Sequence, residues 1–122
     1  MMTAKRDPGL LLPLTPAMFH VLLALADEER HGYAIIKDVE ARTNGKVRLG
    51  AGTLYGLIKK LLLEGLIEES RRRPPAAEDD ERRRYYRLTA FGRQVLVAEV
   101  ERLEEDVAIA RSKDFFKRIQ PA

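Results

Sequence analysis

The sequence of 122 residues contains no cysteine, no tryptophan and only two histidines. Without cysteine there are no disulfides, no thiolate nucleophile and no thiolate ligands for zinc. His20 and His31 each lack a second ligand at helical spacing, so we expect no metal site and no cofactor. The longest apolar stretches, residues 10–14 and 21–26, fall far short of the roughly 20 residues that span a bilayer, and no secretory signal is present. These absences predict a cytoplasmic protein that does not enter a membrane.

Features typical of an enzyme are also missing. The sequence has no Gly-Lys-Ser/Thr phosphate-binding loop. Its acidic runs at residues 27–29, 78–81 and 104–106 fall on predicted turns or on a solvated helix face. General acid–base catalysis needs a carboxyl group in a buried site that shifts its pKa, and none of these runs offers one. We therefore predict that the protein is not an enzyme.

The charges are unevenly distributed along the chain. The formal net charge is only +3, which by itself says little about a partner. Between residues 46 and 73, however, there are seven basic residues against three acidic ones, whereas between residues 89 and 118 there are six of each. A local excess of positive charge is what a phosphate-binding surface requires. On charge alone, an ordinary solvated basic patch remains an alternative.

The basic segment contains the stretch around which the chain is organised, residues 50–64 (GAGTLYGLIKKLLLE). Its apolar residues follow helical spacing and form one stripe: Leu54, Leu57, Ile58, Leu61 and Leu62. The opposite side is small, hydroxyl-bearing and cationic, with Tyr55 at its boundary: Gly52, Thr53, Gly56, Lys59 and Lys60. A helix of this kind can approach a phosphate-lined groove closely, so we interpret it as a DNA-recognition helix. Leu63 projects to the polar side, and its role stays open between packing under the following hairpin and packing on a partner subunit.

The elements before this helix predict the first part of a winged helix-turn-helix. Residues 1–14 are expected to form an irregular arm. Thr15 followed by Pro16 starts a helix that runs to about residue 26, and a polar turn follows at residues 27–30. Gly32 opens a second helix, which ends near Thr43 before Asn44 and Gly45. Residues 46–49 alternate polar and apolar side chains, which predicts a short strand.

The elements after it predict the wing. Residues 66–70 and 85–88 read as the two strands of a hairpin, and residues 74–82 as its proline- and acid-bearing tip. The fold class is therefore mainly α with a small β-hairpin, and residues 15–88 form a winged helix-turn-helix DNA-binding domain. In this arrangement the helix at 50–64 lies in the major groove of double-stranded DNA.

A long C-terminal helix at residues 89–118 and a tail at 119–122 complete the chain. One side of this helix carries a seam with coiled-coil spacing: Leu96, Val100, Leu103, Val107 and Ala110. Phe91, Val95 and Ala98 form a second apolar patch, which can pack on the helix's own domain. The seam is then left for another chain, so we predict a homodimer whose interface also includes Phe19. A fully intramolecular lid is the alternative.

The expected DNA contacts divide into two kinds. Cationic side chains bind phosphates, whereas Thr53 and Tyr55 reach base edges or thymine methyl groups. The predicted cations come from the segment before the recognition helix, from that helix and from the wing: Arg48, Lys59, Lys60, Arg71, Arg72, Arg73 and Arg83. A two-fold dimer of this kind reads a pseudo-palindromic operator.

Several segments resemble the PadR family of bacterial transcriptional regulators. They are HGYAIIKDVE (31–40), GAGTLYGLIKKLLLEGLIEE (50–69) and YYRLTAFGRQVL (85–96), together with the opening TPAMFHVLLAL. The resemblance covers most of residues 15–96 and, by the room left at the C-terminus, points to the small subgroup with a single C-terminal helix. It implies a winged-helix repressor that dimerises through this helix, and it adds Tyr33 to the DNA-contacting residues. Unlike many relatives, this sequence has Gly56 after the TLY motif, and its wing tip is longer.

The resemblance also implies that a small-molecule effector could bind the protein. Some small relatives bind flat aromatic compounds between their subunits through tryptophan, which this sequence lacks. Its phenylalanines at positions 19, 91, 115 and 116 are candidate substitutes. A second function stays open as well: a winged helix whose basic face binds an acidic protein partner rather than DNA.

Overall fold

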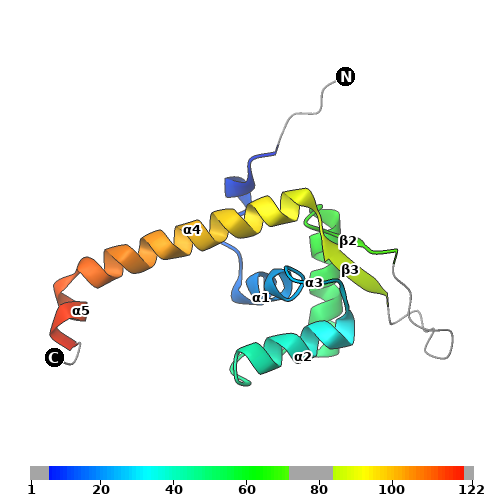
Figure 1. Ribbon diagram of the computed structural model, residues 1–122, viewed down its shortest axis with the longest axis horizontal. Coiled ribbons are helices and arrows are strands. Elements are labelled where there is room, and N and C mark those ends of the chain that lie inside the picture. Colours follow the sequence, from blue (N-terminus) through cyan, green and yellow to red (C-terminus); the bar gives the residue numbers. More distant parts are fainter. Residues whose placement is uncertain (1–5, 72–83, 120–122) are drawn as a thin grey trace.

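The computed structural model describes residues 6–71 and 84–119 (Figure 1). Over these ranges the elements, in chain order, are η1 (Pro8–Leu11), α1 (Pro16–Ala24), β1 (Arg30–His31), α2 (Gly32–Arg42), α3 (Ala51–Leu63), β2 (Ile67–Glu69), β3 (Tyr85–Leu88), α4 (Ala90–Ser112) and α5 (Asp114–Ile119). The fold is mainly helical with a small antiparallel sheet, and it is a winged helix-turn-helix, as the sequence predicts.

The predicted helix starts are confirmed by side-chain caps. Thr15 begins α1, and its Oγ1 accepts the backbone N–H of Met18 at 3.1 Å. Thr89 caps α4 in the same way. The ring Nδ1 of His31 accepts the N–H of Ala34 at 3.1 Å, so this histidine caps α2. Each cap satisfies a donor that the first turn of a helix leaves without an intrahelical partner.

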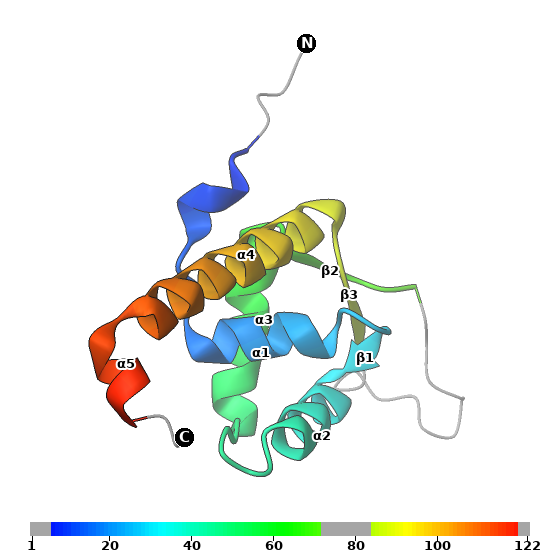
Figure 2. The ribbon, with the colours of Figure 1, turned by 60° about the vertical axis from the view of Figure 1, so that its left-hand side comes forward.

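The apolar stripe of α3 lies at the centre of the core. Leu54, Ile58 and Leu61 are at most 3% exposed. They pack among residues from the other helices and strands: Val21, Leu22, Ile35, Val39, Leu66, Ile67 and Val95. Figure 2 shows α1 between α4 and α2, with α3 behind it. Leu62 lies at the edge of the stripe, and Leu63 is 79% exposed, so no described part of the chain covers it.

The strand predicted at residues 46–49 is wrong. This segment is irregular, because Thr43 at the end of α2 takes up its backbone groups: the Thr43 Oγ1 accepts the N–H of Val47 at 3.0 Å. The third strand is instead β1, at a position expected to be part of a polar turn. Its Arg30 and His31 pair with Tyr86 and Tyr85 of β3.

The predicted hairpin strands are confirmed. β2 and β3 pair antiparallel with Ile67 opposite Leu88, and the strand order is β1-β3-β2. Ile67 and Leu88 are buried, so the hairpin is held to the helical core by its base. The tip at 74–82 lies outside the described residues.

The N-terminal arm is more regular than expected. Residues 8–11 form the 3-10 helix η1, whose cap is Asp7, and η1 packs against α4. Leu14 is buried, and Leu11 and Leu12 pack against the core, whereas Leu10 is 81% exposed. An apolar run that covers the side of α4 explains the ordering of this segment.

The first turn of α4 lies unusually close to the start of β2. The Thr89 Oγ1 donates to the carbonyl of Gly65 at 2.6 Å, and the Thr89 N–H donates to the carbonyl of Leu66 at 3.1 Å. Gly65 has a φ of +75°, the left-handed conformation predicted for the residue that ends α3. A Cβ on Gly92 would lie 2.0 Å from the Leu66 carbonyl oxygen, so only glycine permits this approach.

The last helix is shorter than predicted. It ends at Ser112 rather than at residue 118, because Lys113 adopts an extended conformation with ψ of 150°. The short helix α5 follows and turns away from the α4 axis (Figure 1). The C-terminal half of α4 extends beyond the helices of the winged domain, as expected from its length.

Glu99 on α4 is a buried carboxylate, only 1% exposed. One of its oxygens accepts the backbone N–H of Leu14 at 2.7 Å, and the other accepts Nε–H of Arg102. The hydrogen bond from Arg102 holds the pKa of Glu99 below its ordinary value, against the opposing effect of burial. This carboxylate therefore fastens the arm to α4.

Gly92→Ala tests the close approach of α4 to β2. The new methyl group would meet a backbone oxygen, which cannot move aside without separating the two elements. We expect the free energy of unfolding in urea to fall by about 3 kcal/mol, the upper end of the usual range for overpacking. Gly56→Ala is the control, since a Cβ there meets open space. It should gain about 0.5–1 kcal/mol from helix propensity, and equal stability of the two variants would contradict the argument.

Glu99→Gln tests the buried ion pair. Because the folded-state pKa of Glu99 is lowered, its stabilising effect is complete at neutral pH and is lost as the pH falls below the ordinary carboxyl pKa towards the lowered one. At neutral pH we expect the variant to be less stable than the wild type by on the order of 1 kcal/mol. The difference should shrink on acidification, as measured by urea denaturation at a series of pH values. Parallel curves for the two proteins would contradict this account.

Candidate nucleic-acid interface

The predicted recognition surface of α3 is open to solvent. Thr53, Lys59 and Lys60 are exposed, and Tyr55 at the boundary is 40% exposed. A Cβ on Gly56 would meet no atom within 4 Å, and the same holds for Gly52. The surface between these side chains is therefore low, so another molecule can approach the helix backbone closely.

Tyr55 connects this surface to the start of α2. A Cβ on Gly32 would lie 2.8 Å from the Tyr55 hydroxyl oxygen and 3.1 Å from the ring carbon that carries it. Glycine at position 32 thus lets the tyrosine lie against the first turn of α2. Tyr33, the next residue, is 60% exposed, so α2 and α3 present their tyrosines at adjoining places.

Lys37 joins this surface, although it was not predicted. Its ammonium group lies 5.3 Å from the centre of the Tyr33 ring, a cation–π contact between residues one helical turn apart. The spacing of four residues from an exposed tyrosine was the available signal in the sequence. Lys37 and Arg48 also line one hollow of about 430 Å³ at the end of α2, together with Glu40, Ala41, Asn44 and Gly45.

The basic side chains divide into free and paired groups. Within residues 6–71 and 84–119, no carboxylate lies within 4.0 Å of the cations on the α2–α3 side: Lys37, Arg48, Lys59 and Lys60. On the sheet, by contrast, Arg84 pairs with Glu69 at 3.8 Å, and Arg87 pairs with Glu68 at 3.6 Å and Glu29 at 3.7 Å. Within the described residues, the positive charge without a carboxylate partner therefore lies on α2, on α3 and on the segment between them, rather than on the base of the wing.

The predicted wing cations are only partly placed by the structure. Arg71 is exposed and lies two residues after the end of β2. Arg72, Arg73 and Arg83 lie outside the described residues.

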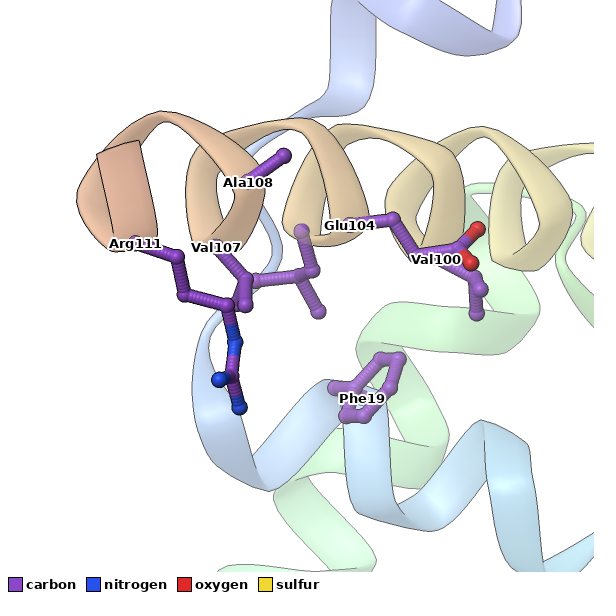
Figure 3. Close-up of a pocket in the computed structure, with 7 residues that line it drawn as sticks. Phe19, Val100, Glu104, Val107, Ala108 and Arg111 are labelled. Atoms are coloured by element: carbon purple, nitrogen blue, oxygen red, sulfur yellow. The ribbon is translucent and has the colours of Figure 1, made fainter. Parts of the chain in front are cut away.

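Four of the predicted dimer-interface residues gather around one apolar hollow of about 440 Å³ between α1 and α4 (Figure 3). They are Phe19, Val100, Leu103 and Val107, and Glu104, Ala108 and Arg111 complete the lining. Figure 3 shows Phe19 of α1 below the row of α4 side chains. An exposed apolar surface of this kind is typical of an interaction site.

Two members of the predicted seam do not line this hollow. Leu96 is 8% exposed and belongs to the core of its own chain, and its assignment to the dimer interface stays a prediction. Its place in the first two turns of α4, where the helix crosses the winged domain, accounts for this burial. Ala110 is half-buried and lies outside the lining of the hollow.

The described part of the chain lacks two further features. None of its helices combines the length and apolar character needed to cross a bilayer. It also holds no group of three or more His, Cys, Asp or Glu side chains placed to bind a metal ion.

Known proteins share both the sequence pattern and the fold. The model of the transcriptional regulator PadR-like family matches residues 21–98. A transcriptional regulator from Clostridium thermocellum superposes with a TM-score of 0.65 at 22% identity, covering 80% of this chain and 91% of that one. A PadR family transcription regulator from Clostridium difficile gives a TM-score of 0.63 at 22% identity, covering 75% and 91%.

A third structure is Bacillus subtilis PadR in complex with operator DNA. It superposes with a TM-score of 0.61 at 24% identity, covering 70% of this chain and 48% of that one. The family match extends over more than half of the sequence and includes α2, α3, the sheet and the first part of α4. The chain therefore belongs to the PadR-like family of transcriptional regulators.

Proposed function

We propose that this protein is a sequence-specific DNA-binding regulator that acts as a homodimeric repressor. The observation that carries the proposal is the uncompensated positive charge of Lys59 and Lys60 on a helix surface kept low by glycine. A phosphate-lined groove fits such a surface, because it supplies negative charge and requires close approach. The operator DNA bound by Bacillus subtilis PadR supports the same role for this chain.

The side chains of the interface have separate tasks in this proposal. Lys59 and Lys60, with Lys37 and Arg48 beside them, bind phosphates and set the register of α3 in the major groove. Thr53 and Tyr55 contact base edges or thymine methyl groups. Tyr33 holds Lys37 in place by its ring and contacts the DNA backbone.

The wing contributes through its outer part. Because Arg84 and Arg87 are already paired with carboxylates, they offer little charge to phosphates. We assign wing contacts to Arg71, Arg72, Arg73 and Arg83.

The dimer forms through α4 and α1. Val107 is 51% exposed, and with Val100, Leu103 and Phe19 it offers an apolar surface that a second copy can cover. Two copies related by a two-fold axis present two α3 helices to half-sites about one helical turn apart, so the operator is a pseudo-palindrome. A dimer bound at a promoter blocks access to that promoter, and this is the basis for proposing repression. We place this activity in the cytoplasm.

A small-molecule effector fits the same region. The hollow has apolar walls, and Glu104 and Arg111 place one charge of each sign at its rim. A flat apolar compound with a polar edge that enters between the subunits would compete with, or reshape, the dimer contact.

DNA binding is tested by fluorescence anisotropy with DNA from the gene's own upstream region and with scrambled DNA of equal length, over a series of salt concentrations. We expect a preference of about a thousandfold that persists at physiological salt. Lys59→Ala should weaken binding to both DNAs and reduce the slope of log affinity against log salt by about one. Weak binding to both DNAs that disappears as salt rises would contradict the proposal and favour an acidic protein partner.

Val107→Glu tests the dimer. A charge in the apolar contact has to be buried without a partner, so we expect at least a tenfold weaker dimer by analytical ultracentrifugation, with weaker operator binding. Ile109→Glu is a matched control, because Ile109 is 52% exposed on the same helix but does not line the hollow. The proposed interface is wrong if both variants remain dimers of wild-type strength.

A further inference from the structure

Arg6 connects the last turn of the recognition helix to the first turn of α4. Its guanidinium group donates to the backbone carbonyl of Glu64 and forms an ion pair with the Glu64 carboxylate at 3.1 Å. The same guanidinium carbon lies 4.4 Å from the centre of the Phe91 ring. Arg6 therefore touches α3 and α4 at once, from a segment 58 residues away in sequence from Glu64.

We infer that Arg6 is a positioning residue that fixes the angle between the recognition helix and the dimerisation helix. This inference rests on the proposed function, because the angle matters only if two copies of α3 read one DNA. Arg6 itself is not assigned to the DNA surface: it binds the carboxyl end of α3, whereas Thr53 and Tyr55 lie near the amino end.

The contact lies where two helices that are distant in sequence meet. Between the end of α3 at Leu63 and the start of α4 at Ala90, the chain passes through the whole hairpin. Beyond the packing of Val95 in the shared core, the helix ends are attached by Thr89, which binds the Gly65 and Leu66 carbonyls, and by Gly92, which lies against the Leu66 carbonyl. The contacts of Thr89 and Gly92 all lie at residues 65–66, so they hold the distance between the helix ends better than the angle. Arg6 adds a separate point of contact on each helix.

The arm itself is anchored, which a positioning role requires. The Asp7 carboxylate accepts the N–H of Gly9 at 2.8 Å and starts η1. At the other end of the arm, Leu14 donates to the buried carboxylate of Glu99, and η1 packs on α4 between these points. Arg6 thus extends from a segment that is attached to α4, and its contact with Glu64 attaches the end of α3 to the same segment.

The geometry of the dimer makes the angle important. At 1.5 Å per residue, the 23 residues of α4 extend about 34 Å, so a small rotation at the junction displaces α3 strongly relative to the partner. Changing the spacing of two half-sites by one base pair moves one of them by about 3.4 Å and rotates it by about 35°. A stiff junction discriminates against such a change, whereas a loose junction tolerates it.

The first experiment measures the distance between the two α3 helices without DNA. The chain has no cysteine, so a single Lys60→Cys exchange introduces one spin label per subunit. Double electron–electron resonance on the labelled full-length dimer should give a broader distance distribution for Arg6→Ala than for the parent. Arg93→Ala is the matched control, because this exposed arginine also lies in the first turn of α4 but has no ion pair within the described residues. A distribution of unchanged width in Arg6→Ala would overturn the inference.

The second experiment measures spacing selectivity with unlabelled protein. The wild type first selects its site from a pool of random duplexes, and one base pair is then inserted or deleted at the centre of that site. For Arg6→Ala we expect the ratio of affinities for the native and altered spacing to fall about tenfold, with Arg6→Lys in between and Arg93→Ala unchanged. Affinity for an isolated half-site should stay within about twofold of wild type, since no DNA contact is lost.

The outcomes separate the two proposals. A wild type that selects no site contradicts the proposed function, and the inference falls with it. If the wild type is selective and Arg6→Ala loses half-site affinity and salt slope, Arg6 contacts DNA directly and the positioning role is wrong. If thermal stability and all affinities fall together at unchanged spacing selectivity, Arg6 serves stability alone, which also overturns the inference.

Discussion

The approach of α4 to the turn between α3 and β2 is the constraint on which the arrangement of this protein depends. At Gly92 the two backbones lie so close that any side chain would collide with the Leu66 carbonyl, and Thr89 fastens the contact with two hydrogen bonds. This junction determines where α4 leaves the winged domain and therefore which of its residues are left exposed to form the proposed dimer contact. Leu96 lies near enough to the junction to be buried in its own chain, whereas Val107 lies beyond the domain and is exposed.

In the described part of the chain, ion pairs neutralise some of the basic side chains and leave others without a carboxylate partner. Several arginines are matched with carboxylates, either within one helix or between elements: Arg42 with Asp38 at 2.7 Å in α2, Arg102 with Glu99 in α4, and Arg87 of β3 with Glu68 and Glu29. The planar guanidinium suits this use, because it donates to two or more acceptors at fixed angles. The lysines of α3 have no such partners within the described residues, which leaves their charge available for the phosphate contacts proposed above. Basic side chains thus divide between those neutralised within the fold and those whose charge stays uncompensated on the surface of the described residues.

Local patterns predicted most of the helical framework. Thr15, Thr89 and Gly65 mark helix ends through preferences of single residues, and the structure places them as expected. The buried face of α3 could be predicted because apolar residues recur at every third or fourth position, the spacing that faces a helix towards the core. The prediction failed at residues 46–49, where alternation resembled a strand but the Thr43 hydroxyl had already taken a backbone donor. It also failed at Lys113, where the helix ends although nothing in the local composition forbids its continuation.

By itself, therefore, the sequence determined the family, the order of the helices and the hairpin, and the chemical character of each face, since these follow from residue types and short-range periodicity. Only the tertiary structure decided which residues meet across long separations. It brought Arg6 to Glu64 and Phe91, buried Glu99 against Leu14, paired β1 with β3, and gathered Phe19 with the α4 seam. The reason is physical: a helix or strand preference depends on neighbours a few positions away, whereas these contacts depend on the packing of the whole domain, which no local pattern records.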